Sequence, residues 1–180
     1  MRRVLLALPL LALPCLAAAH PGHALAQTAY LTLAPGEVRL ELSLVVGEDA
    51  VAPLLAALDP DGDGQATEAE ARAWAEEVLR QAALTLDGEP VAWVMEAAEV
   101  PDLATLATGS AELRVQATAE APDGEGTHIL AFANSYAPAE TVRTANVFVE
   151  PGEGWTARVT GQERSADGAG LEVSYEVGAE

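Results

Sequence analysis

The sequence contains no lysine, and its nine basic residues are all arginines, set against 28 acidic residues. The formal net charge is −19 at pH 7. Nucleic acids and anionic lipid surfaces are bound through cationic side chains, so this charge argues against both as partners. The same charge suits the binding of cations, although solubility alone also accounts for many surface carboxylates.

Cysteine is almost absent, since the single copy, Cys15, lies in an N-terminal segment that resembles a secretory signal peptide. Residues 1–3 read Met-Arg-Arg, and residues 4–18 form an apolar stretch interrupted by two prolines. A positive start followed by a short apolar run is typical of a leader that is cleaved on export. The mature chain then has no disulfide, no thiol nucleophile and no thiolate metal ligand.

Two Ala-x-Ala motifs mark where such a leader ends. The motif at residues 17–19 predicts a signal peptide of residues 1–19 and a mature domain of residues 20–180. A second motif at residues 24–26 would move the cleavage to the bond after residue 26. No later segment approaches about 18 uninterrupted apolar residues, the length of a membrane helix. We therefore expect an exported protein, periplasmic or extracellular, with no membrane span in its mature chain.

Short alternating segments dominate the mature sequence. The clearest is Val38–Val46, where every second residue is valine or leucine and the residues between are mostly polar, a pattern typical of a half-buried strand. Further strands are predicted at 28–33, 84–86, 91–95, 112–119, 127–134, 144–149, 155–161 and 171–177, with an Asp87-Gly88 hairpin turn after the second of these. We expect an α+β, mainly β fold: a single domain built as an antiparallel β-sandwich.

A helix-loop-helix insertion interrupts the strands over residues 49–83. Its first helix is predicted from apolar residues at i, i+3, i+4 and i+7, beginning at Val51, with Asp49 as the N-cap. Its second helix is predicted to begin near Thr67. An apolar stripe marks the buried face of that second helix: Ala71, Trp74, Ala75, Val78, Leu79 and Ala82.

The loop between the two predicted helices carries the strongest motif. Residues 59–70 read Asp-Pro-Asp-Gly-Asp-Gly-Gln-Ala-Thr-Glu-Ala-Glu, which matches the pattern D-x-D-x-D-G-x5-E in full. Over residues 49–83 the sequence therefore resembles the EF-hand calcium-binding family, as a single hand. The resemblance implies Ca²⁺ as the bound ion.

The spacing suits calcium, which prefers about six to eight hard oxygen ligands. The expected ligands are the side chains of Asp59, Asp61, Asp63, Thr67 and Glu70 together with the backbone carbonyl of Gln65. Gly64 permits the positive φ that turns the chain sharply after the third aspartate.

Two observations favour weak binding or no binding. Ala66 stands where the family has a β-branched residue or leucine that pairs with a second hand, and no second hand is visible. We expect an affinity on the order of 10⁻⁴–10⁻³ M, as in extracellular modules. Thr67-Glu68-Ala69-Glu70 is also a capping box, which would fix Thr67 and Glu70 by helix-end hydrogen bonds alone, and the aspartates could form a solvated loop.

A weaker resemblance covers the whole chain. Three segments make it similar to the exported β-rich domains associated with bacterial nickel/cobalt-permease-like membrane proteins: Ala19-His20-Pro21, Tyr30–Pro35 with the alternating strand after it, and Leu84–Gly88. This resemblance implies a membrane-protein or periplasmic partner.

The N-terminal histidines supply the alternative function, a periplasmic nickel- or copper-handling accessory protein of a metal transport system. After cleavage at residue 19, the α-amine and imidazole of His20 together with His23 would offer the nitrogen ligands that these metals favour. His128 is the only other histidine, and we expect it to be structural or simply exposed rather than a metal ligand. Ser135 and the other serines have no histidine base near them in the sequence. We therefore expect no catalytic centre.

Overall fold

The computed structural model describes residues 23–122 and 124–178. The predicted signal peptide, the first cleavage motif and His20 lie outside these residues. No helix among the described residues is long and apolar enough to cross a membrane.

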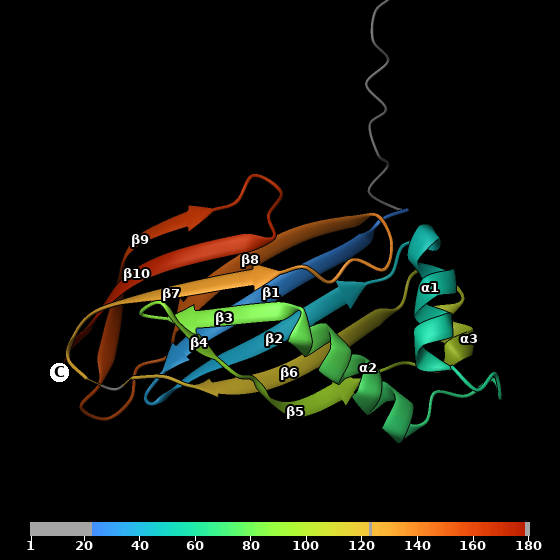
Figure 1. Ribbon diagram of the computed structural model, residues 1–180, viewed down its shortest axis with the longest axis horizontal. Helices are drawn as coiled ribbons and strands as arrows, with labels where there is room; N and C mark the ends of the chain where they lie inside the picture. The colour runs from blue at the N-terminus through green and yellow to red at the C-terminus, as the bar shows by residue number, and fades with distance from the viewer. Residues whose placement is uncertain (1–22, 123, 179–180) are drawn as a thin grey trace, which may run out of the picture.

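Ten strands in the described part of the chain form two five-stranded sheets (Figure 1). Sheet A has the order β5-β6-β2-β1-β8, and sheet B has the order β4-β3-β7-β10-β9. The strands of sheet A are β1 (Leu25–Ala34), β2 (Glu37–Val45), β5 (Val94–Glu99), β6 (Glu112–Glu120) and β8 (Thr141–Val149). Those of sheet B are β3 (Ala82–Leu86), β4 (Glu89–Val91), β7 (Gly126–Asn134), β9 (Thr156–Arg164) and β10 (Gly170–Gly178).

Sheet B is antiparallel throughout, whereas sheet A is mixed. Strands β1 and β8 run parallel, in register from Leu25 opposite Thr141 to Leu33 opposite Val149. The mainly β, two-sheet character is thus confirmed, and the expectation of purely antiparallel pairing is wrong. Alternation records only which face of a strand is buried, so it carries no information about the direction of the neighbouring strand.

The two sheets share one hydrophobic core, built from the residues that alternate inward along each strand. Strand β2 contributes Val38, Leu40, Leu42 and Leu44, each at most 2% exposed. Sheet B contributes its own inward residues, among them Leu130, Phe132, Leu171, Val173 and Tyr175. The outward positions of β2 are mostly charged or polar, so the strand is half-buried as its alternation predicts.

The three helices of the described residues lie toward one end of the sheets: α1 (Glu48–Leu58), α2 (Glu68–Arg80) and α3 (Leu103–Leu106) (Figure 1). Helix α2 buries Trp74, Ala75, Val78 and Leu79, which confirms the predicted stripe. Ala82, placed on the same stripe by its spacing, instead begins β3. The four-residue helix α3 carries no periodicity that the sequence could reveal.

Helix α1 begins two residues earlier than expected, with Gly47 rather than Asp49 as its N-cap. A Cβ at Gly47 would lie 2.2 Å from the backbone oxygen of Ala24, so only glycine allows this approach to the chain entering β1. The Asp49 N–H donates to the backbone oxygen of His23 at 3.1 Å. Contact with the start of β1 therefore determines where α1 begins.

The segment 91–95, predicted as one strand, contains the end of one strand and the start of another in the opposite sheet. Strand β4 ends at Val91 in sheet B, and β5 begins at Val94 in sheet A. Between them Trp93 donates its indole N–H to the backbone oxygen of Ala82 at 2.6 Å. The chain crosses between the sheets at this point, which an apolar run by itself does not reveal.

Candidate metal centre

The loop from Asp59 to Thr67 joins two helices that are both anchored in the core. Leu58, the last residue of α1, is fully buried, and Trp74 on α2 is 3% exposed. The Asp59 N–H donates to the Leu55 backbone oxygen at 2.9 Å and ends α1. Ala66 is partly buried and packs against the core. The ends of the loop are therefore fixed while its acidic residues project outward.

The Asp59 carboxylate organises the loop by accepting backbone hydrogen bonds across it. One oxygen accepts from the Asp63 N–H at 2.9 Å, and the other accepts from the Gly64 N–H at 3.1 Å. Asp61 also accepts from the Asp63 N–H, at 3.2 Å, and Asp63 accepts from the Gln65 N–H at 2.8 Å. These bonds wind the loop tightly around its own carboxylates.

Two glycines make this winding conformationally accessible. Gly62 has φ +74° and Gly64 has φ +83°, values that side-chain-bearing residues rarely adopt. No heavy atom lies within 4 Å of where a Cβ would stand at either position, so the requirement is conformational and not one of space. The positive φ expected at Gly64 is confirmed.

The winding brings three of the six predicted ligand residues together. One carboxylate oxygen from each of Asp59, Asp61 and Asp63 lies within 4.8 Å of the others. Asp59 is partly buried and the other two are exposed. Three carboxylates at this separation repel one another and attract a cation, although such exposed acidic groups also occur without a metal.

Thr67 and Glu70 lie outside this cluster and contact each other instead. The Thr67 N–H and hydroxyl both donate to Glu70 Oε2, at 2.9 and 2.7 Å. The Glu70 N–H donates to the Thr67 hydroxyl oxygen at 3.3 Å and completes a capping box at the start of α2. The capping box given as the alternative for these two residues is therefore confirmed. Gln65, the remaining predicted ligand residue, is exposed.

The histidine site predicted from the N-terminus is only partly described. His23 lies next to α1, with Nδ1 3.3 Å from a carboxylate oxygen of Glu48. His20 lies outside the described residues, so no geometry joins the two.

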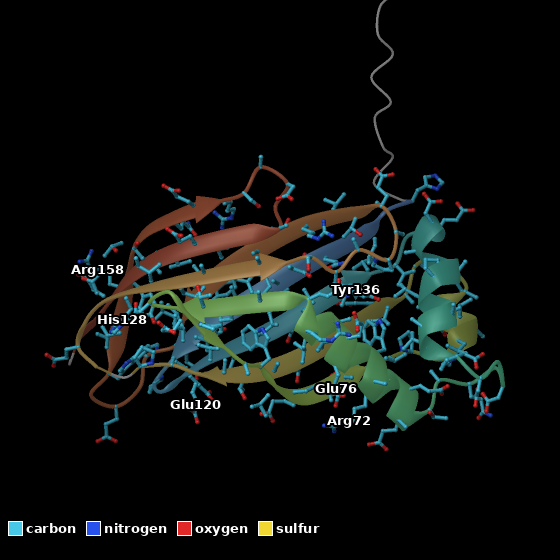
Figure 2. All side chains as sticks on the ribbon, in the orientation of Figure 1. Arg72, Glu76, Glu120, His128, Tyr136 and Arg158 are labelled. Atoms are coloured by element: carbon cyan, nitrogen blue, oxygen red, sulfur yellow. The ribbon has the colours of Figure 1, made fainter. Side chains whose placement is uncertain are left out.

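His128 is the residue whose surroundings sequence reasoning did not anticipate (Figure 2). Its Nδ1 lies 2.8 Å from an Asp87 carboxylate oxygen, and its Nε2 lies 2.9 Å from the backbone oxygen of Gly124. The hydrogen bond to Asp87, followed by the bond to Gly124, raises the pKa of His128 above its ordinary value. The Asp87-Gly88 turn was the only signal near this contact, and no local sequence pattern connects the turn with residue 128.

No protein-family model, curated protein or solved structure matches the chain.

Proposed function

We propose that this is an exported calcium-binding protein in which the EF-hand loop Asp59–Glu70 holds one Ca²⁺, either as a structural ion or to support the binding of a partner. The observation that supports the proposal is the convergence of the Asp59, Asp61 and Asp63 carboxylates within 4.8 Å, between two helices anchored in the core. Carboxylate oxygens are hard donors, which Ca²⁺ prefers, whereas the softer transition metals prefer nitrogen and sulfur ligands.

Binding in this loop requires Glu70 to exchange partners. Its Oε2 accepts both hydrogen bonds from Thr67, so a contact to calcium through both carboxylate oxygens would weaken or replace them. The cost of losing the capping contact, together with the lack of a visible second hand, favours an affinity on the order of 10⁻⁴–10⁻³ M. Such an affinity fills the site wherever calcium reaches millimolar concentrations.

Export is part of the proposal, with the leader removed after residue 19. Ala24 is 4% exposed and Leu25 is fully buried, and the Leu25 N–H donates to the Glu140 backbone oxygen at 2.8 Å. Cleavage after residue 26 would remove these buried contacts at the start of β1. Cleavage after residue 19 keeps them.

Calcium titration calorimetry and thermal unfolding of the chain 20–180 test the proposal. Calcium at about ten times its dissociation constant should stabilise the protein by about 1.4 kcal/mol, which corresponds to a rise in melting temperature of about 3–6 °C. The Asp59→Ala variant should lose both the heat signal and the rise. Glu163→Ala, which removes an exposed carboxylate from β9, should keep both.

An unchanged melting curve at several millimolar calcium would contradict the proposal. A larger response to nickel or copper than to calcium, abolished by replacing His23, would favour the transition-metal alternative instead.

A further inference from the structure

The chain is poor in aromatic residues, with three tryptophans, three tyrosines and two phenylalanines. Only two aromatic side chains among the described residues are exposed: Tyr30 on β1 at 37% and Phe148 on β8 at 52%. Their ring centroids lie 6.2 Å apart on the outer face of sheet A, where Thr32 is the direct neighbour of Phe148. The two exposed rings thus form one aromatic pair on a sheet face otherwise occupied largely by polar side chains.

A shallow hollow of about 370 Å³ lies beside this pair. Its rim is formed by side chains from four adjacent strands of sheet A: Tyr30, Arg39, Glu41, Glu96, Gln116 and Thr118. The register explains the grouping, because Glu41 stands directly opposite Tyr30 on one side and Gln116 on the other. The hollow therefore joins an aromatic ring to carboxylates.

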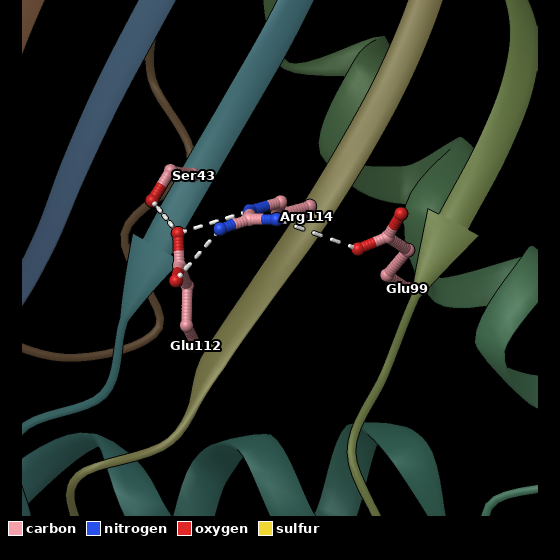
Figure 3. Close-up of polar contacts among 4 residues, drawn as sticks. All are labelled: Ser43, Glu99, Glu112 and Arg114. Carbon is pink, nitrogen blue, oxygen red and sulfur yellow. Dashed lines mark hydrogen bonds and ion pairs between the residues drawn. The ribbon is translucent and has the colours of Figure 1, made fainter.

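Both arginines on this face are already bound to carboxylates. Arg39 contacts Glu37 at 3.1 Å and Glu150 at 2.8 Å. Arg114 contacts Glu112 through two nitrogens at 3.1 Å each and Glu99 at 3.8 Å (Figure 3).

The carboxylates at the rim of the hollow are not neutralised in this way. Glu96 accepts a hydrogen bond from the Thr118 hydroxyl at 3.0 Å, which leaves its charge uncompensated. Within residues 23–122 and 124–178, neither Glu41 nor Glu96 has an ion pair within 4 Å, and Glu41 attracts Arg114 only from beyond that distance. The hollow therefore carries surplus negative charge next to an exposed ring.

We propose that the outer face of sheet A docks an arginine-bearing segment of a basic partner protein. A guanidinium seated in the hollow would pair with Glu41 and Glu96 and stack on Tyr30, since it forms planar hydrogen-bonded pairs with carboxylates and is attracted to aromatic faces. A second copy of the chain is a poor occupant, because two bodies each carrying −19 repel one another.

In the test, a short peptide of alternating glycine and arginine is titrated into the calcium-saturated chain 20–180. Binding is monitored through the backbone amide chemical shifts in NMR. Peptide-induced shifts should be confined to β1, β2, β5 and β6. Glu41→Gln and Tyr30→Ala should each weaken binding about 3- to 10-fold. Tyr30→Leu, which keeps apolar bulk but removes the ring, should weaken it as well.

Glu172→Gln provides the matched control, because it removes the same charge from the exposed side of β10 in sheet B. It should change the affinity by less than about 1.5-fold. Equal losses in Glu172→Gln and Glu41→Gln would overturn the proposal, because binding would then follow net charge alone. Equal binding of a glycine–serine peptide would also overturn it.

Discussion

At the scale of single residues, the contacts of His128 depend on whether its imidazole is protonated. Its two ring nitrogens face a carboxylate oxygen of Asp87 and the backbone oxygen of Gly124. A neutral imidazole has only one N–H, so both acceptors are satisfied only when the ring is protonated. The Tyr175 ring, 5.5 Å away, covers the inner side of the pair, and its own pKa is raised to about 12 by burial first and by Asp87 second.

The pair makes stability depend on pH in a defined window. The pKa of His128 is raised, so its contribution is complete below the ordinary histidine pKa and is lost as pH rises through the raised value. The pKa of Asp87 is lowered by His128 first and by the Ile129 N–H second, so its contribution is lost as pH falls through the lowered value. The pair therefore stabilises most between about pH 4 and pH 6.5.

The Asp87→Asn variant tests this window. Asparagine tolerates the φ of +51° at this turn position and keeps an oxygen for the Ile129 N–H, so the hairpin is retained. In NMR titrations the His128 pKa should be above about 6.5 in the parent protein and should fall toward that value in the variant. A His128 pKa that does not respond to Asp87→Asn would contradict the assignment.

At the scale of elements, the start of α2 serves as a helix cap and is also part of the proposed calcium loop. Thr67 and Glu70 exchange the reciprocal bonds of a capping box. The cap stabilises the empty loop, whereas calcium would require the Glu70 carboxylate to turn toward the aspartates. The two roles can be separated by substitution, because glutamine replaces glutamate in a capping box but is a poorer calcium ligand.

Two variants make this separation measurable by urea unfolding with and without calcium. Thr67→Ala should destabilise the calcium-free protein by about 0.5–2 kcal/mol, because the Glu70 N–H loses its acceptor. Glu70→Gln should leave calcium-free stability almost unchanged and abolish the gain from calcium. A calcium response that survives Glu70→Gln would remove Glu70 from the site.

Local sequence patterns predicted many of the elements but not their neighbours. The buried residues of Val38–Val46 recur at every second position, and those around Trp74 recur at helical spacing. Both patterns lie within one short segment, so β2 and α2 were predictable. The Asp87-Gly88 turn followed from its residues, which adopt positive φ. The crossing near Trp93 and the β1–β8 pairing depend on distant contacts that no short pattern encodes.

The candidate site divides in the same way. The spacing of Asp59, Asp61 and Asp63 was enough to expect their convergence, because Gly62 and Gly64 can adopt the positive φ that a tightly wound loop needs. The position of Glu70 was not determined by spacing, since the capping box and the metal compete for one carboxylate.

At the scale of the whole molecule, a buried polar network joins the two sheets. Gln27 on β1 and Asn134 on β7 are 2% and 4% exposed, and Asn134 donates its amide to the Gln27 oxygen at 2.5 Å. Gln27 donates to the Tyr136 backbone oxygen at 2.9 Å, and Arg143 donates to the same oxygen at 2.9 Å. Trp74 on α2 donates its indole N–H to the Tyr136 hydroxyl at 2.9 Å, so the network also holds the helix. Tyr136 is labelled in Figure 2.

Replacing Gln27 should therefore lower the free energy of unfolding by more than the small change in side-chain volume suggests. Gln27→Leu leaves the Asn134 amide without its acceptor in a buried site, and we expect a loss of about 1–3 kcal/mol in unfolding free energy measured in urea. Thr28→Val, on the opposite face of the same strand, should change stability by less than about 0.5 kcal/mol. If the Gln27→Leu protein is as stable as its parent, the hydrogen-bond network does not contribute to the free energy of unfolding.

The parallel pairing of β1 with β8 has a consequence for the order of assembly during synthesis. Strand β1 emerges from the ribosome early, yet one of its two edges finds its partner only when Thr141–Val149 has been made. Until then one edge of this apolar strand has no partner, and an open strand edge invites aggregation. The protein can complete sheet A only after most of its chain has been translated.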